Sequence, residues 1–472
     1  MRARLKQVVL PLLLAILTLP STLRAEEARA PNVVVFLADD LGWGDLGCYG
    51  HPRIKTPHLD QFAMQGVRLT QCYSACGVCS PSRSAILTGR TPYRNGVYRW
   101  IPEVPREGSH VHLRTSEITI PELLKKRGYE TCHVGKWHLN GAFNSPDQPQ
   151  PDDHGYDYWF ATQNNAAPTH KDPVNFVRNS EPVGPLTGYS ALLVVEEAIH
   201  WLHETRSVDK PFFLAVWTHE PHLPIESDPQ YQQLYADLPV GFRQHHGNVT
   251  QLDAAFGNLM RALDEQGLAD NTVVFFTADN GPEGDGHGDP RNPGSQRDRN
   301  RGSTGGLRGR KRADFEGGIR VPGIVRWPGH IEPGTLSNVP VIGSDIFATV
   351  CGIVGIPVPD DRVIDGADMR PAFAGNPITR TRPLYWRTHI SPRDCRVAVR
   401  VDEWKIVADE TLTEFLLFDM HEDPQESSDV SAAYPEVHQR MKQALLKMER
   451  EVLGEGPDWW KGDSTSGVAQ RR

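Results

Sequence analysis

The sequence predicts an α/β fold: a mainly parallel sheet flanked by helices, with a small antiparallel sheet and one helix near the C-terminus. Two apolar runs, residues 32–38 and 271–278, are rich in β-branched residues and lack polar alternation, which is typical of strands buried in a parallel sheet. Strand and helix patterns alternate between these runs. Beyond about residue 380 the pattern changes to short strands separated by turns.

The segments between the two apolar runs supply the alternation. In chain order we expect a helix at residues 120–127, a strand at 129–134, a helix at 190–204, a strand at 211–216 and a helix at 251–266. The helix at 190–204 places Leu192, Val195, Ile199 and Leu202 on one face, as a helix packed on a core does. This order indicates a mainly parallel sheet with right-handed crossovers.

The C-terminal part predicts a separate α+β subdomain. Its expected elements are strands at residues 384–386, 396–401, 404–407 and 414–418 and a helix at 435–452. We therefore divide the chain into a main domain at residues 26–379, a subdomain at 380–455 and a polar tail at 456–472.

Residues 1–25 have the features of a secretory signal peptide. A basic start precedes an apolar run at residues 8–19, and small residues lead to an expected cleavage site near Ala25. An anchor helix is the alternative, but the run is too short to span a bilayer, and Pro11 and Pro20 interrupt it. We expect an exported protein, periplasmic or extracellular, without stable membrane insertion.

Composition narrows the class of protein. Apolar residues make up 39% and charged residues 23% of the 472 positions, which is typical of soluble globular proteins. The formal net charge of −9 argues against a nucleic-acid partner. Seven cysteines form neither a dense disulfide framework nor a zinc pattern, and their pairing cannot be read from the sequence: Cys48, Cys72, Cys76, Cys79, Cys132, Cys351 and Cys395.

One segment differs from the acidic balance of the whole chain. Between Glu283 and Arg312, seven arginines and Lys311 face four acidic residues. A solvated, glycine-rich loop explains this composition, and so does a surface that attracts an anionic substrate.

Polar residues follow both apolar runs. Asp39 and Asp40 come directly after the first run, and Asp279 and Asn280 come after the second. Ligands of open α/β sheets bind beyond the carboxyl ends of the strands, so we expect these side chains to lie together. Carboxylate and amide oxygens suit Ca²⁺ or Mg²⁺, although a single acidic pair also serves as a turn or helix cap. Two such pairs favour a metal site.

Lysine and histidine side chains follow two other strands. Lys136 and His138 are two residues apart, so in an extended chain they face the same side. A lysine there would neutralise an ester oxygen, and an imidazole would move protons near neutral pH. After residues 211–216, His219 and His222 compete for a similar role. The His-x-Pro placement favours His222, with His219 as the alternative or as support.

A short cysteine pattern adds a candidate nucleophile. Cys79-Ser80-Pro81-Ser82-Arg83 has the spacing CxPxR and is followed by Leu-Thr-Gly-Arg. Taken alone it fits an ordinary turn, because Pro81 fixes φ. Lys311, taken alone, would be a surface lysine.

The ordered set of these segments resembles the sulfatase family of the alkaline-phosphatase-like superfamily, from about Pro31 to Pro328. The segments are the Asp39-Asp40 tip, CxPxR with LTGR, GKWHL, the His-x-Pro segment, the Asp279-Asn280-Gly281 tip and EGGIRVP. The resemblance implies an alkaline-phosphatase-like fold and a sulfuric ester hydrolase whose catalytic domain is residues 26–379. It also implies that a separate maturation enzyme oxidises Cys79 to Cα-formylglycine.

The same resemblance implies roles for individual residues. One divalent cation, usually calcium and alternatively magnesium, would be bound by Asp39, Asp40, Asp279, Asn280 and the converted Cys79. Arg83 would steady the aldehyde hydrate, and Lys136 and Lys311 would hold the sulfate. One hydroxyl of the hydrate would attack sulfur, His222 with Lys311 would protonate the departing alcohol, and His138 would take the second hydroxyl's proton to expel sulfate. Asn164, Asn165 and His219 are further candidates for substrate binding.

Three other functions are compatible with these residues. Related enzymes with the same fold cleave phosphodiesters or phosphonate monoesters. A non-catalytic carbohydrate-binding protein would retain only part of the site. An unmodified Cys79 would act as a thiolate nucleophile, under different activation rules. For the substrate we expect a sulfated small molecule or carbohydrate, because export and the arginine-rich segment fit such a compound.

Overall fold

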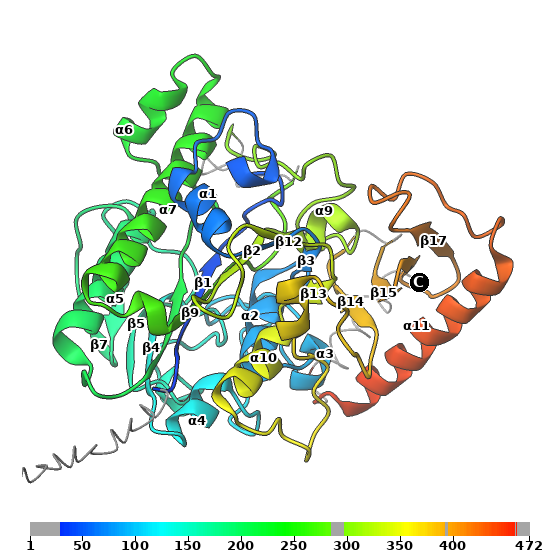
Figure 1. Cartoon of the computed structure of the whole chain (residues 1–472), viewed down its shortest axis with the longest axis horizontal. Helices are drawn as coiled ribbons and strands as arrows, with labels where there is room; N and C mark the ends of the chain where they lie inside the picture. Colours follow the sequence, from blue (N-terminus) through cyan, green and yellow to red (C-terminus); the bar gives the residue numbers. More distant parts are fainter. Residues whose placement is uncertain (1–28, 285–296, 392–394, 458, 460–472) are drawn as a thin grey trace, which may run out of the picture.

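The computed structural model describes residues 29–284, 297–391, 395–457 and 459. The predicted signal peptide at residues 1–25 lies outside these ranges, as does most of the predicted polar tail. The main body is built on a ten-stranded mixed sheet with the order β12-β2-β11-β9-β1-β8-β4-β5-β6-β7. A separate four-stranded sheet lies near the C-terminus (Figure 1). The predicted fold class is confirmed.

The middle of the large sheet is parallel. In order across the sheet, its strands are β9 (Thr272–Ala278), β1 (Asn32–Ala38), β8 (Phe212–Trp217), β4 (Glu130–Lys136) and β5 (Tyr158–Thr162). Every residue of β1 and β9 is buried, which explains their unbroken apolar sequences. The pairing of Ala38 with Ala278 makes these two strands end side by side.

Antiparallel pairs extend the large sheet on both sides. β11 (Gly323–Arg326) pairs with β9 and β2 (Val67–Leu69), and β6 (Val177–Arg178) pairs with β5 and β7 (Glu181–Pro182). The remaining short strands are β12 (Thr335–Ser337), which pairs with β2, and β10 (Arg320–Val321), β3 (Cys72–Tyr73) and β13 (Val341–Ile342), which form a small sheet.

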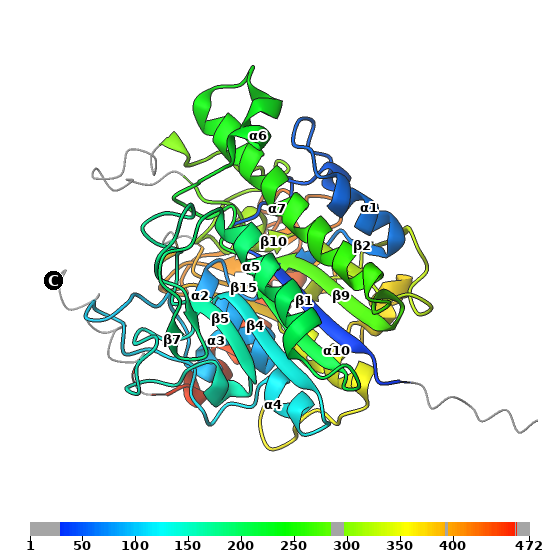
Figure 2. The ribbon, with the colours of Figure 1, turned by 90° about the vertical axis from the view of Figure 1, so that its left-hand side faces the viewer.

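Helices cover both faces of the large sheet. Figure 2 shows α5 (Ser190–His200) and α7 (Val240–Glu265) across one face, with α1 (Pro57–Gln65) against α7. On the other face, α2 (Cys79–Thr88) contacts α10 (Asp345–Val354). Shorter helices are α3 (Pro92–Asn95), α4 (Ile120–Lys125), α6 (Pro229–Gln232) and α9 (Glu316–Ile319). No helix in the described ranges is long and apolar enough to cross a bilayer.

Several predicted boundaries were wrong. α7 begins at Val240 and not at residue 251, because its first turns bury polar side chains such as His245 and Asn248, which give no apolar periodicity. The helix predicted at 190–204 ends in a π-helical turn, Trp201–Thr205. The strand predicted to end at residue 134 continues to Lys136, so this lysine belongs to β4 itself.

The C-terminal sheet contains the predicted strands in sequence order. They are β14 (Leu384–Arg387), β15 (Val397–Val401), β16 (Trp404–Ala408) and β17 (Phe415–Asp419), all antiparallel. Helix α11 (Pro435–Glu455) packs on β15 and β16 (Figure 1). The fully buried Lys405 of β16 forms ion pairs with Glu316 (2.9 Å) and Glu426 (2.8 Å), so a buried charge network connects this sheet to the main body.

Candidate active site

The polar residues that follow β1 and β9 lie together, because the two strands end in register. Asp39, Asp40, Asp279 and Asn280 are all buried. The Asp40 backbone N–H donates to Asp279 Oδ1 (3.2 Å), and Asn280 Nδ2 donates to Asp40 Oδ1 (2.7 Å). These hydrogen bonds join the tips of the two strands into one cluster of oxygen ligands.

Each carboxylate of the cluster has a different buried cation as its partner. The closest contacts are Lys136 Nζ to Asp39 Oδ2 (2.5 Å), Lys311 Nζ to Asp40 Oδ1 (2.6 Å) and Arg83 Nη2 to Asp279 Oδ2 (2.8 Å). Burial opposes ionisation of Asp39, but Lys136 and three other positive or ionisable neighbours hold its pKa well below the ordinary value. Burial and the neighbouring Asp39 raise the pKa of Asp279 to about 7, although Arg83 opposes this shift. Carboxyl groups and cationic side chains therefore alternate around this site.

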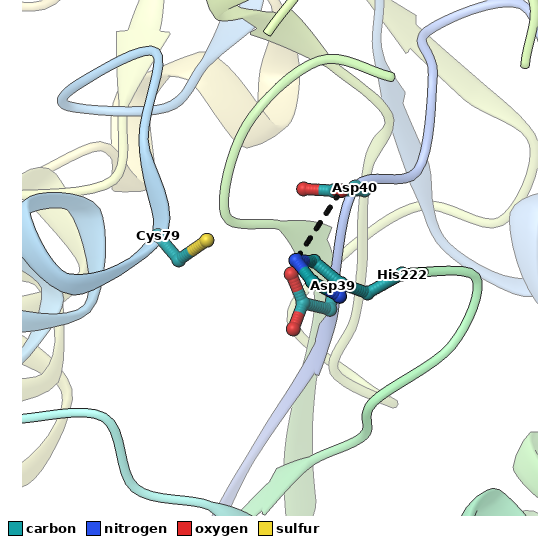
Figure 3. Close-up of side chains that lie close together, drawn as sticks. All are labelled: Asp39, Asp40, Cys79 and His222. Carbon is teal, nitrogen blue, oxygen red and sulfur yellow. Dashed lines mark ion pairs between the residues drawn. The ribbon is translucent and has the colours of Figure 1, made fainter. Parts of the chain in front are cut away.

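The cluster has the composition of a site for a hard divalent cation. Asp39, Asp40, Cys79 and His222 each place one ligand atom within 4.8 Å of the others (Figure 3). Asp39 Oδ1 and Asn280 Oδ1 are buried, and neither has a hydrogen-bond partner among the described residues. Buried oxygens without hydrogen bonds are costly unless another group binds them, so the residues present fit Ca²⁺ or Mg²⁺.

Cys79 is the first residue of α2, and its side chain points toward the two aspartates (Figure 3). The CxPxR segment is therefore a helix start and not an isolated turn. Pro81 lies in the first turn, where its missing N–H costs no helical hydrogen bond. Burial raises the pKa of the Cys79 thiol to about 12, although Lys136 and Lys311 partly oppose the shift. The unmodified side chain is thus a thiol, which disfavours thiolate attack.

His138 lies just beyond β4 with one ring nitrogen fixed and the other without a partner. Its Nε2 is 3.0 Å from the Ile101 carbonyl oxygen, which only accepts, so Nε2 carries the proton of the neutral ring. Nδ1 has no partner within the described part of the chain. Burial lowers the pKa of His138 well below its usual value. The neutral ring therefore retains an Nδ1 lone pair that can take up a proton.

The structure separates the roles of His219 and His222. His222 Nδ1 donates to the Leu223 carbonyl oxygen (2.5 Å), and its Nε2 lies 3.7 Å from Asp40 Oδ2. His219 is fully buried behind the site, with Nε2 2.8 Å from Thr162 Oγ1. Of these two histidines, only His222 lines the pocket that contains Cys79. This placement agrees with the preference for His222.

Three site residues adopt positive φ angles, which are rare outside glycine. The angles are 64° at Asp40, 56° at His138 and 81° at Arg312. Gly135 also has a positive φ, and a Cβ there would lie 2.0 Å from the Trp217 carbonyl oxygen. The left-handed residues allow neighbouring side chains to face the same site, where a regular strand would direct them to opposite sides.

A pocket of about 320 Å³ opens onto these groups. It is lined by Val78, Cys79, Trp100, His138, Asn164, His222, Leu223, Pro224, Glu283, Arg299, Lys311, Arg312 and Ile390. Of the two asparagines considered for substrate binding, Asn164 lines the pocket, whereas Asn165 does not and donates its Nδ2 to the Leu223 carbonyl oxygen (3.0 Å).

Some lining residues were missed by sequence reasoning. Glu283, Arg299 and Arg312 belong to the arginine-rich segment, whose charge was the available signal. Trp100 gave no signal in the sequence. Ile390 was also missed, because it follows β14 in the C-terminal region and local patterns do not reveal contacts between distant segments.

A family model for sulfatases matches residues 31–356. The chain belongs to the sulfatase family. It is therefore a sulfuric ester hydrolase, and it hydrolyses sulfate esters. A second model, for the C-terminal region of N-sulphoglucosamine sulphohydrolase, matches residues 309–451.

Curated sulfatases match most of the chain. Rat N-acetylgalactosamine-6-sulfatase is 35% identical over 416 residues, covering 81% of this chain and 72% of the relative. Human arylsulfatase A is 34% identical over 483 residues, covering 90% of this chain and 89% of the relative. The pocket thus belongs to a chain that aligns with these two sulfatases over 81% and 90% of its length.

Several solved structures have the same architecture. The Ps i-CgsB complex with k-i-k-neocarrahexaose superposes with a TM-score of 0.80 at 26% identity, covering 94% of this chain and 97% of that one. The PsFucS1 sulfatase from Pseudoalteromonas sp. superposes with a TM-score of 0.72 at 25% identity, covering 92% of each chain. A phosphonate monoester hydrolase from Agrobacterium radiobacter, at 0.63 and 19% identity, shares the fold.

Proposed function

We propose that this sulfatase is exported and hydrolyses sulfate monoesters on carbohydrate, using a formylglycine made from Cys79 and one divalent cation. The observation that carries this proposal is the position of Cys79. Cys79 is the first residue of α2. Its side chain faces Asp39 and Asp40 in a pocket that Lys311 and His222 also line. A nucleophile there would meet the sulfate among several positive charges.

The proposed cation is calcium, with magnesium as the alternative. Asp39, Asp40, Asp279, Asn280 and the oxidised Cys79 would hold it. When bound, it would supply positive charge to the sulfate oxygens and to the attacking oxygen. Two buried oxygens, on Asp39 and Asn280, have no hydrogen-bond partner among the residues that the structure describes, and they support this assignment.

Side chains that line the pocket, together with Lys136 and Arg83 buried beside it, would handle the charge and the protons. The hydrated formylglycine supplies the attacking hydroxyl and, through its second hydroxyl, a way to release sulfate. Lys136 and Lys311 offset the negative charge of the sulfate, and Arg83 holds Asp279 while its Nη1 donates to the Lys136 carbonyl oxygen (2.8 Å). His138 Nδ1 is positioned to accept a proton. Burial lowers the pKa of His222 to about 4, and its neutral ring carries the proton on Nδ1, so the leaving alcohol would take its proton from the Lys311 ammonium, directly or relayed through His222 Nε2.

The substrate class is proposed from the relatives and from the pocket lining. The names of the matched N-acetylgalactosamine-6-sulfatase and of the complex with k-i-k-neocarrahexaose refer to carbohydrate. In this chain Trp100 offers an aromatic surface, and Arg299 and Arg312 offer positive charge at the pocket wall. Asn164 is the more suitable of the two asparagines for a contact with the sulfate.

Maturation and export complete the proposal. The chain would require a formylglycine-generating enzyme, and residues 1–25 would direct it out of the cytoplasm. All seven cysteines lie in the described ranges, and no disulfide bond joins any two of them.

Sulfate release tests the proposed function. The full chain would be produced with a formylglycine-generating enzyme, and ion chromatography would measure sulfate released from a panel of sulfated mono- and polysaccharides. We expect release from at least one carbohydrate by the matured protein and none by Cys79→Ala. Faster turnover of an aryl phosphodiester than of any sulfate ester would assign the protein to the rival class. Full activity with an unconverted Cys79, seen by peptide mass spectrometry, would exclude the formylglycine mechanism.

A further inference from the structure

Two arginines at the pocket wall share one carboxylate. Arg312 binds Glu283 through both terminal nitrogens (2.5 and 2.9 Å), and Arg299 Nη1 binds Glu283 Oε1 (3.0 Å). All three residues line the pocket that contains Cys79. Because two guanidinium groups face a single carboxylate, this cluster, here called the diarginine cluster, keeps an excess positive charge.

The backbone holds the diarginine cluster in place. Lys311 N–H donates to the Pro282 carbonyl oxygen (3.1 Å), and Arg312 N–H donates to the Gly77 carbonyl oxygen (2.8 Å). The positive φ of Arg312 lets two consecutive residues line one pocket: Lys311 binds Asp40, and Arg312 binds Glu283. The cluster is thus a fixed feature of the pocket wall.

The diarginine cluster retains capacity to bind a ligand. Arg299 Nε is buried and has no hydrogen-bond partner among the described residues. The Arg312 side chain is 35% exposed and lines the pocket, so it is accessible from solvent. A planar guanidinium donates two parallel hydrogen bonds to a carboxylate or sulfate, which matches these free positions to an anionic oxygen group.

A second cavity also has Arg312 in its lining. It has a volume of about 710 Å³, and it shares Lys311, Arg312 and Ile390 with the pocket that contains Cys79. Its other lining residues include Thr304, Arg310 and Ser391. The two cavities therefore adjoin at Arg312, which both of them contact.

We propose that Glu283, Arg299 and Arg312 form a recognition site for a second anionic group of the substrate. This inference rests on the proposed function and narrows its substrate class to sugars with an anionic group besides the scissile sulfate. That group is a second sulfate on the same ring or the carboxylate of an adjoining uronic acid. Glu283 fixes the two guanidinium groups, and their remaining N–H donors bind the anion.

Binding measurements on a protein that cannot turn over test the proposal directly. Calorimetry would use the calcium-loaded full chain carrying Cys79→Ala. The probes are N-acetylgalactosamine 6-sulfate, its 4,6-disulfate, and the disaccharide in which an unsaturated uronic acid is linked to N-acetylgalactosamine 6-sulfate. We expect at least one of the two dianionic probes to bind about tenfold more tightly than the monosulfate, as a charge-assisted hydrogen-bonded pair would provide. Tighter binding of the disulfate would identify the second anionic group as a sulfate, and tighter binding of the disaccharide would identify it as the carboxylate of a uronic acid.

Substitutions in the same background assign that advantage to the diarginine cluster. Arg299→Gln and Arg312→Gln should each reduce it to less than about threefold. Arg299→Lys keeps the positive charge, so this variant should retain part of the affinity advantage of the dianionic probe. Arg301→Gln is the matched control, because Arg301 comes from the same segment, packs over Phe242 and lines neither cavity. Thermal unfolding would verify that each variant is folded.

Two results would overturn the proposal. One is equal affinity of all three probes for the parent protein, and the other is an advantage that survives both glutamine substitutions. Neither result depends on catalysis. A failure of the proposed function would instead be seen as no sulfate release by the matured wild-type protein from any carbohydrate of the panel.

Discussion

Cys79 and Arg83 lie one helical turn apart on α2 and face the same buried cluster. Figure 3 shows the Cys79 side chain directed toward Asp39 and Asp40, and Arg83 donates two hydrogen bonds to Asp279 Oδ2 (3.0 and 2.8 Å). The four-residue spacing of CxPxR is the spacing that places two side chains on one helix face. The pattern therefore connects the candidate nucleophile and the metal-binding carboxylates through a single helix.

Removing the Arg83 guanidinium should destabilise the protein. Arg83→Met would leave Asp279 buried without its ionic partner, a loss typically worth about 3–5 kcal/mol. Urea unfolding would measure the change in the free energy of unfolding. Arg370→Met is the control, since Arg370 and its partner Asp368 are partly exposed and such pairs contribute little. Equal effects of the two substitutions would contradict the buried pairing.

Lys311 should contribute mainly to turnover. Lys311→Ala would remove the ammonium group that binds Asp40 and lines the pocket, and we expect kcat/KM for a sulfate ester to fall by about 10²–10³-fold. Lys210→Ala is the matched control, because Lys210 is exposed and pairs with Glu130 away from the pocket. Steady-state kinetics on the matured protein would compare the two. A decrease in kcat/KM of less than tenfold for Lys311→Ala would show that Lys311 is not one of the catalytic residues.

Calcium should stabilise the folded protein against heat. A ligand that binds only the folded state at a concentration 100 times its Kd contributes about 2.7 kcal/mol. We expect Tm to fall after treatment with EDTA and to recover with calcium, and Asp39→Asn to abolish that recovery. Asp237→Asn should behave as wild type, since Asp237 forms an exposed ion pair with Arg53. A Tm that does not respond to calcium or magnesium would argue against the metal site.

Stability should decrease in mild acid, partly because of His154. Burial lowers the pKa of His154 to about 4, although Asp153 and the Leu113 backbone partly oppose this shift. The unfolded chain binds this proton near pH 6.5, whereas the folded protein resists it, so stability falls as pH decreases from about 6.5 to 4. The full contribution of one such histidine is about 3 kcal/mol.

Unfolding experiments at pH 7 and pH 5 would test the contribution of His154. His154→Phe should lose less stability between the two pH values than wild type does. His421→Phe should lose as much as wild type, because His421 is exposed. Identical pH dependence of wild type and His154→Phe would refute the assignment.

The sequence predicted what depends on local patterns. Residues 32–38 read as a buried strand because all seven side chains are enclosed, and the adjoining aspartates followed from the rule for strand ends. The His-x-Pro placement favoured His222 over His219, and in the structure the turn after β8 directs the His219 ring inward, whereas His222 lines the pocket. Contacts between distant segments had no local signal. Arg299 meets Glu283 only because two parts of a glycine-rich segment fold against each other.

Through Ile390, the C-terminal region forms part of the wall of the pocket that contains Cys79. The residues proposed to carry out the chemistry come from α2, from the ends of β1, β4, β8 and β9, and from the segment before α9, whereas Ile390 follows β14 of the separate sheet. The identity of the accepted sugar is therefore open to change, in evolution or by engineering, through residues that never touch the reacting sulfate. Grafting the segment after β14 from another sulfatase would be the most direct way to alter selectivity while retaining the catalytic group.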